Sequence, residues 1–90
     1  MVDEYITLNA TDTAQYYDLG LEFIMFMIRN KGPYPVRVRV GDENATVDAN
    51  TGMYIIPGET RVVQMPGRYI HYIAVGGGSP TAKIEIEAFL

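Results

Sequence analysis

The 90-residue chain contains no cysteine and only one histidine. Without cysteine it has no disulfide framework and no thiolate for catalysis or metal binding. A chain this short buries only about 60–65% of its unfolded surface, so its small core needs another source of stability, and oligomerisation is the simplest one. The cellular compartment stays open, because cysteine-free proteins fold in reducing and oxidising surroundings alike.

The sequence also lacks the short motifs of common catalytic sites. Its only histidine, His71, lies inside the strand-like run Tyr69–Ala74, which indicates a structural position rather than a chemical one. No G-x-S-x-G or H-E-x-x-H motif is present, and the glycine run Gly76–Gly78 leads into Ser79-Pro80, not into the lysine of a phosphate-binding loop. We therefore expect a protein without enzymatic activity and without a cofactor.

Positive charge is scarce. Seven basic residues against 11 acidic ones give a net charge of −4, which argues against binding to nucleic acid or to anionic membranes. The longest apolar run, Phe23–Ile28, is far too short to span a bilayer, and the first residues carry acids where a signal peptide carries bases. Because 48% of the residues are hydrophobic, we expect a folded, soluble chain.

Turn-forming residues recur at short intervals, which leaves room for strands and little room for helices. These segments are 9–12, 31–33, 41–44, 50–52, 57–58, 66–67 and 76–80. Between them, Val36–Val40 and Lys83–Ala88 alternate strictly between apolar and charged residues, as half-buried antiparallel strands do. The whole chain, residues 1–90, is thus predicted to be one all-β domain, a small antiparallel β-sandwich of about seven to eight short strands.

Two connections in this sandwich are predicted to be hairpins. Pro66-Gly67 lies between the β-rich segments Thr60–Met65 and Tyr69–Val75, and Asn30–Pro33 leads into the strand at 35–40. The turn Pro57–Thr60 is expected instead to carry the chain from one sheet to the other.

The apolar stretch Leu19–Asn30 has no clear period, so a helix capped by Asp18 is an alternative to a strand. We favour the strand, in which Leu21, Phe23, Met25 and Met27 face one side and Glu22, Ile24, Phe26 and Ile28 face the other. One face enters the core. The other needs a cover, either the N-terminal arm of residues 1–18 or a neighbouring subunit. The candidate interface residues are Tyr16, Tyr17, Leu21, Phe23, Ile24, Phe26 and Ile28.

Two ligand-binding alternatives remain open. Asp42, Glu43 and Asp48 could supply oxygen ligands to calcium, although their spacing does not match a known calcium loop and favours a tight turn stabilised by Asp and Asn side chains. Several tyrosines could bind a sugar, although tyrosine is equally typical of protein interfaces. These tyrosines are Tyr34, Tyr54, Tyr69 and Tyr72.

Four segments follow one another in a characteristic order: Arg29–Pro33, Val36–Gly41, Ile55–Thr60 and Tyr69–Ala74. Over residues 23–88 this pattern resembles the small, jelly-roll-like β-sandwich domains of tailed-phage virion proteins; residues 1–18 have no counterpart in it. The resemblance implies a capsid decoration, head-fibre or tail-associated component, located in the virion and bound to a larger capsid or tail protein. It also implies a homo-oligomer, trimers being frequent among such proteins. A carbohydrate- or calcium-binding β-sandwich module is the alternative function.

Overall fold

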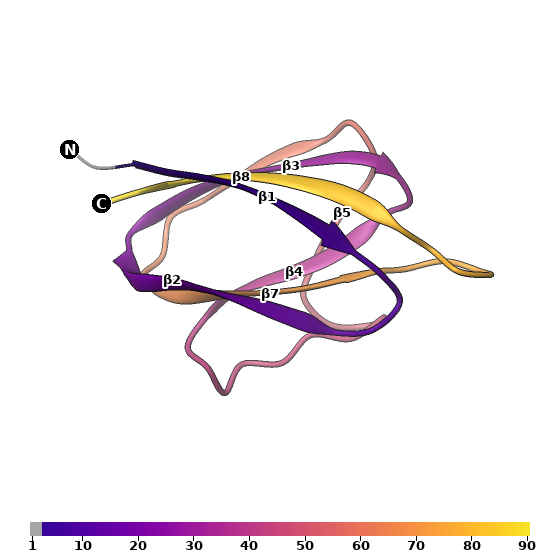
Figure 1. The fold of residues 1–90 in the computed structure, drawn as a ribbon, viewed down its shortest axis with the longest axis horizontal. Coiled ribbons are helices and arrows are strands. Elements are labelled where there is room, and N and C mark those ends of the chain that lie inside the picture. The colour runs from indigo at the N-terminus through magenta and orange to yellow at the C-terminus, as the bar shows by residue number, and fades with distance from the viewer. Residues whose placement is uncertain (1–2) are drawn as a thin grey trace.

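Two four-stranded antiparallel sheets pack face to face in the computed structural model, which describes residues 3–90 (Figure 1). Sheet A has the strand order β1-β8-β3-β6, and sheet B has the order β2-β7-β4-β5. The strands are β1 (Asp3–Ala10), β2 (Gln15–Phe23), β3 (Met25–Pro33), β4 (Val36–Gly41), β5 (Met53–Ile55), β6 (Thr60–Val63), β7 (Gly67–Ala74) and β8 (Ala82–Phe89). The predicted all-β sandwich is confirmed.

The strand pairing is that of a jelly roll. β1 pairs with β8, β2 with β7, β3 with β6 and β4 with β5, so the chain forms one long antiparallel ribbon of four strand pairs. Wrapping this ribbon adds the contacts of β8 with β3 and of β7 with β4, which close the two sheets. An eight-stranded double sheet of this kind is the jelly-roll architecture. Within residues 3–90 no helix has the length and apolar character needed to cross a bilayer.

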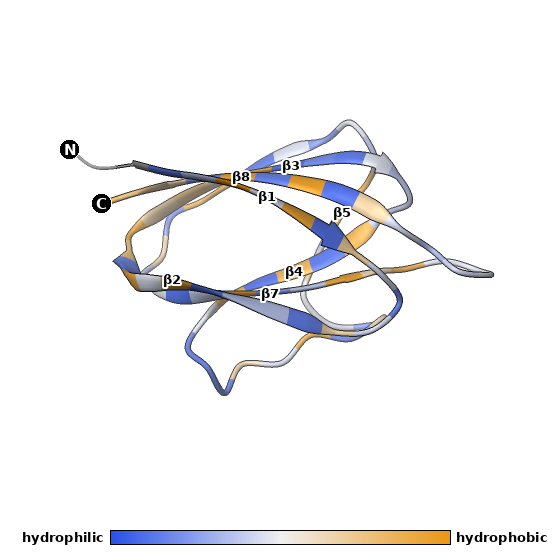
Figure 2. Cartoon of the chain, viewed as in Figure 1, coloured by the Kyte–Doolittle hydropathy of each residue, from blue (hydrophilic) through white to orange (hydrophobic). Residues whose placement is uncertain are grey.

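Alternation along the strands builds the core. In β4 the valines Val36, Val38 and Val40 point inward and are buried, whereas the intervening arginines point outward. In β8 the inward residues include Ile84 and Ile86, and Figure 2 shows the alternating hydropathy along the strands of both sheets. The strands predicted at 36–40 and 83–88 are therefore confirmed.

The apolar stretch Leu19–Asn30 is strand rather than helix, but it is not one strand. β2 ends at Phe23 in sheet B and β3 begins at Met25 in sheet A, with a bend at Ile24 whose N–H donates to the carbonyl of Phe89 at 2.9 Å. Because the chain changes sheets there, Phe23 and Phe26 both enter the core, although a continuous strand would put them on opposite faces. The single-strand prediction is wrong for this reason.

The N-terminal arm expected over residues 1–18 lies within the sheets wherever the structure describes it. Residues 3–10 form β1, which pairs with β8 along its whole length, and residues 15–18 begin β2, which pairs with β7. Leu8 and Ala10 of β1 are buried in the core. This segment thus belongs to the sandwich itself, whereas residues 1 and 2 lie outside the described residues.

Neither predicted hairpin forms. The connection after Pro33 leads from sheet A to sheet B, and so does the connection through Pro66 between β6 and β7. In the wrapped ribbon the chain passes back and forth between the sheets, and within residues 3–90 only the β4–β5 connection stays in one sheet. The crossing predicted at Pro57–Thr60 is confirmed: the N–H of Glu59 donates to the carbonyl of Ile56 at 3.1 Å, and Gly58 has a positive φ of 87°, as a type II turn requires.

Candidate interaction surface

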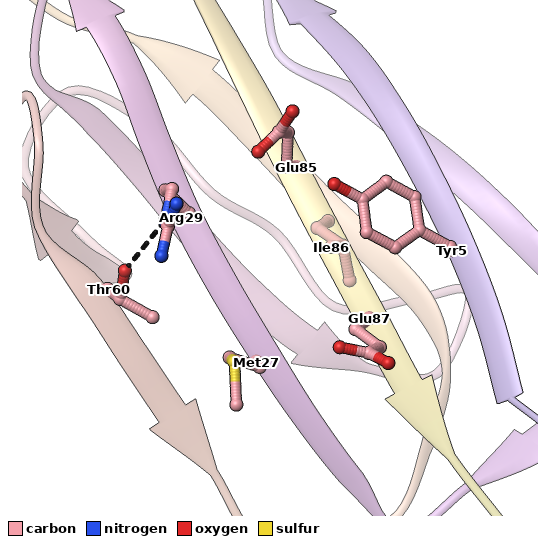
Figure 3. A pocket seen from close by; sticks show the side chains of 7 residues that line it. All are labelled: Tyr5, Met27, Arg29, Thr60, Glu85, Ile86 and Glu87. Carbon is pink, nitrogen blue, oxygen red and sulfur yellow. Dashed lines mark hydrogen bonds between the residues drawn. The ribbon is translucent and has the colours of Figure 1, made fainter.

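The outer face of sheet A is open. Cross-strand register places Tyr5, Glu87, Met27 and Val62 in one row across the four strands of this sheet. The next row contains Thr7, Glu85, Arg29 and Thr60. Figure 3 shows the shallow hollow between these rows, with Tyr5 on β1 and Met27 on β3 flanking the two glutamates of β8.

One half of this face is apolar except for Glu87. Tyr5, Met27 and Val62 are 63%, 39% and 56% exposed, and the partly exposed Met25 and Phe89 stand opposite each other in the adjoining row. We call the set Tyr5, Met25, Met27, Val62 and Phe89 the apolar patch. A polar residue at any of these outward positions would leave the core intact, so burial within the chain does not explain their apolar character.

The other half of the face is polar. Arg29 donates its Nε–H to the hydroxyl of Thr60 at 3.1 Å and stands directly opposite Glu85. Lys31 lies 4.0 Å from Glu85, at the limit of an ion pair. Both signs of charge therefore border the apolar patch, while Glu87 lies within its first row, between Tyr5 and Met27.

The outer face of sheet B is covered in part by the chain itself, although Tyr16 and Tyr54 on it remain 54% and 41% exposed. The loop between β4 and β5 is drawn below sheet B in Figure 1. Its buried Val47 lines the same small pocket as Tyr16 and His71 of this face. His71, also buried, has its Nε2 2.8 Å from the carbonyl oxygen of Asp42 in the loop. Arg37 donates to the carbonyl of Gly52, where the loop ends, at 3.0 Å. His71 thus holds the loop against the sheet, and sheet A presents the more open of the two outer faces.

The structure disperses the interface residues expected from the sequence. Phe23, Phe26 and Ile28 lie in the core, because the bend at Ile24 turns all three inward, and they cannot contact a partner. The remaining four are exposed, but not as one surface. Tyr16 and Tyr17 lie on β2 in sheet B, Leu21 lies near the end of that strand and Ile24 lies at the bend.

Sequence reasoning missed the apolar patch, although part of its signal was present. Extending the alternation of Lys83–Ala88 by one residue places Phe89 outward, and the alternating run Tyr5–Ala10 places Tyr5 outward. The sequence does not show that β1 and β3 flank β8 and that β6 pairs with β3 in the same sheet, because this order depends on pairing between distant segments.

Tyr16, Tyr69 and His71 form an aromatic group on the outer face of sheet B, with Tyr16 and Tyr69 edge-on at 5.7 Å between ring centroids. Beside it, Asp18 accepts hydrogen bonds from Nε and Nη2 of Arg68 at 2.7 and 2.9 Å. These bonds, with a further one from the N–H of Gly20, lower the pKa of Asp18 from 3.8 to about 2. The pair fixes the irregular end of β2 against β7.

The residues considered for calcium and sugar binding lie in separate turns, strands and the core. The carboxylates of Asp42 and Asp48 accept the backbone N–H groups of Asn44 and Asn50 at 3.0 and 2.7 Å, so each stabilises its own turn, as the sequence predicts for Asp42. Across residues 3–90 no group of three or more His, Cys, Asp or Glu side chains is placed to hold a metal ion. Tyr72 lies in the core, so the four tyrosines considered for sugar binding share no face.

Fold and surface together define a class: a small jelly-roll domain with one sheet face partly covered by its own loop and the other open and partly apolar. A comparison with models of known protein families finds no match. A comparison with curated proteins also finds none.

Proposed function

We propose that this chain is a non-enzymatic structural protein that associates with copies of itself and with a larger protein lattice, as a component of a phage virion. The observation that carries the proposal is the apolar patch on the open face of sheet A. Contiguous exposed apolar side chains bordered by polar ones are typical of surfaces that bind other proteins.

The composition of the patch suits a contact with protein. Tyr5 offers a large apolar ring with a polar hydroxyl, and Met25 and Met27 are flexible thioethers that adapt to irregular surfaces. Arg29 and Glu85 at its border can pair with charges on a partner and fix the orientation of the contact. Such a surface favours protein as the partner over a sugar or a metal ion.

The fold supports the phage assignment by analogy. Jelly rolls build viral capsid proteins and also lectins, so the architecture is compatible with both functions and decides neither. The order of turns and strands over residues 23–88 resembles virion domains, and the patch supplies a surface for assembly. We therefore assign the chain to the capsid-like branch of this fold.

The proposal predicts that the mass in solution rises above that of the monomer as protein concentration increases, measured by light scattering. The double variant Met27→Lys/Val62→Lys places two charges in the patch, and we expect it to weaken association through the patch by about tenfold or more. Both positions are exposed, so the fold should persist. The matched control is Ile56→Lys, an equally exposed apolar residue in the β5–β6 turn.

A wild-type protein that stays monomeric at every concentration would contradict self-association. Equal weakening by the control and the double variant would show instead that the effect is general and not a property of the patch. A melting temperature that rises with calcium or with a polysaccharide would favour the ligand-binding alternative.

A further inference from the structure

β1 is a long and regular exposed sheet edge. Of the four edge strands, β5 and β6 have three and four residues, and β2 has a register irregularity between Asp18 and Phe23. β1 has eight residues in unbroken register with β8, and no strand pairs with its other side among residues 3–90. It contains no proline, lysine or bulge; its one edge-protecting feature is charge at its first residues, where Glu4 stands opposite the buried Ala88, and residues 5–9 carry none.

We propose that β1 pairs antiparallel with β1 of a second copy, about a two-fold axis through Thr7, so that two A sheets join into one continuous sheet. The inference rests on the proposed self-association and specifies a contact between the two copies. Such pairing satisfies the free backbone N–H and C=O groups along the edge of each copy.

The side chains of β1 select this register. In an antiparallel pair, directly opposed residues have their side chains on the same face of the sheet. A two-fold axis perpendicular to the sheet must therefore lie midway between the two copies of one residue, here Thr7. With the axis at Thr7, Ile6 stands opposite Leu8 of the second copy on the inner face, and Tyr5 stands opposite Asn9 on the outer face. Thr7 then faces its own symmetry mate, and threonine pairs are favourable across strands.

The neighbouring registers are less favourable. An axis at Ile6 places the carboxylate of Glu4 opposite the large apolar Leu8 of the second copy, whereas the axis at Thr7 places it opposite the smaller Ala10, near the end of the strand. An axis at Leu8 extends the pairing to Glu4 opposite Asp12, two like charges that repel. Residues 5–9 carry no charge, so the register centred on Thr7 is self-complementary and needs no other partner.

Partly exposed core residues lie beside this edge. Ile6 stands opposite the buried Ile86 and packs against the core, yet remains partly exposed. Tyr17, on the neighbouring edge strand β2, stands opposite the buried Ile70 and is 38% exposed. Both therefore belong to the inner faces at an open side of the sandwich. A second copy paired along β1 brings its own Ile6 and Leu8 beside them and reduces their exposure.

The pairing also arranges the apolar patches. A two-fold axis perpendicular to the joined sheet leaves the outer faces of both copies on the same side. The two patches, one from each copy, then point in one direction and can contact one large protein surface together. Two linked contacts bind more tightly than either alone, since the second becomes intramolecular.

The first experiment uses the absence of native cysteine. Thr7→Cys and Asn9→Cys are prepared separately in the Met27→Lys/Val62→Lys background, where association through the patch is weakened, and are mildly oxidised. At the axis the two Thr7 Cβ atoms lie about 4.5–5.5 Å apart, close to disulfide geometry, whereas two Asn9 residues are offset by about 13 Å along the strands. We expect disulfide dimers about tenfold faster from Thr7→Cys.

The second experiment tests charge at the axis in the same background. Thr7→Lys and Thr7→Glu should each be monomeric, because like charges would oppose each other, and an equal mixture of the two should recover the dimer. Thr13→Lys, at an exposed position in the β1–β2 turn, is the matched control and should remain dimeric.

The outcomes separate the two proposals. Oligomers that persist unchanged in Thr7→Lys, or equal cross-linking from Asn9→Cys, would overturn the β1 pairing and leave self-association standing. A wild-type monomer at every concentration would overturn both.

Discussion

At the residue scale, the buried Asn30 connects several segments of the fold. It is fully buried, its Nδ2 donates to the carbonyls of Tyr34 and Ile55 at 2.9 Å each, and its Oδ1 accepts the N–H of Gly32 at 2.7 Å. Its backbone also bonds Gly58 and Glu59 in the turn between β5 and β6. One side chain therefore joins the end of β3 to both sheet crossings beside it.

Replacing Asn30 with Ala should lower the free energy of unfolding by about 3 kcal/mol, because it leaves one N–H and two carbonyls without their partner in a buried place. Urea denaturation measures the change. Asn50→Ala, at an exposed loop position, is the control and should change stability by less than about 0.5 kcal/mol. A similar loss in both variants would contradict the role assigned to Asn30.

The Asp18–Arg68 pair predicts a pH dependence of stability. The pKa of Asp18 falls from 3.8 to about 2 on folding because Arg68 and Gly20 donate hydrogen bonds to its carboxylate. A carboxyl whose pKa is lowered stabilises the fold fully above its unfolded pKa, and that contribution is lost as pH falls through the folded pKa. The exposed position of the pair keeps its contribution modest.

The stability difference between the wild type and Asp18→Asn should therefore shrink as pH falls from 3.8 towards 2, followed by urea denaturation at each pH. In an Arg68→Gln background, which removes the main donor, the same substitution should have much less effect. A difference that is constant with pH would show that the carboxylate is not titrating as expected.

At the scale of a single element, β3 separates core from surface residue by residue. Phe26→Ala should cost about 3–5 kcal/mol, because Phe26 is fully buried and leaves a cavity. Met27→Ala, its exposed neighbour, should stay within about 0.5 kcal/mol. Thermal or urea unfolding distinguishes them. Equal effects would mean that the alternation of β3 is not as described.

The same elements show what the sequence could predict. Two strands could be predicted, Val36–Val40 and Lys83–Ala88, because one face of each is apolar and the other charged, which gives a clear period of two. The bend within Leu21–Ile28 could not be predicted, because both faces of this stretch are apolar and no glycine or proline marks Ile24. That bend is fixed by the carbonyl of Phe89, at the far end of the chain.

The candidate surface was only partly predictable for a related reason. Outward positions such as Phe89 follow from alternation within a strand, but the patch exists because Tyr5, Met27 and Val62 come from three strands that share one sheet. Exposed and buried apolar residues look alike in a sequence. The sequence therefore indicates an interface position for Phe26, although the structure places this residue in the core.

At the scale of the whole molecule, strand order was hidden because the ribbon pairs the first strand with the last. Among the strands of the described residues, only the β4–β5 pair joins consecutive strands, and the other pairs join segments from distant parts of the sequence. Turn residues such as Pro57-Gly58 revealed where the chain changes direction, but not which strand it meets afterwards. The architecture was predictable as a sandwich, and its connectivity was not.

The first pairing of the ribbon has a further consequence. Asp3 stands opposite Phe89, so the start of β1 and the end of β8 lie side by side, and Figure 1 shows these two strands running together. Opposed Cα atoms in such a pair are about 4.5–5.5 Å apart. Two points this close together match the two ends of a break in a surface loop of another protein. The domain therefore has the geometry required for insertion into such a loop without distortion of the host chain.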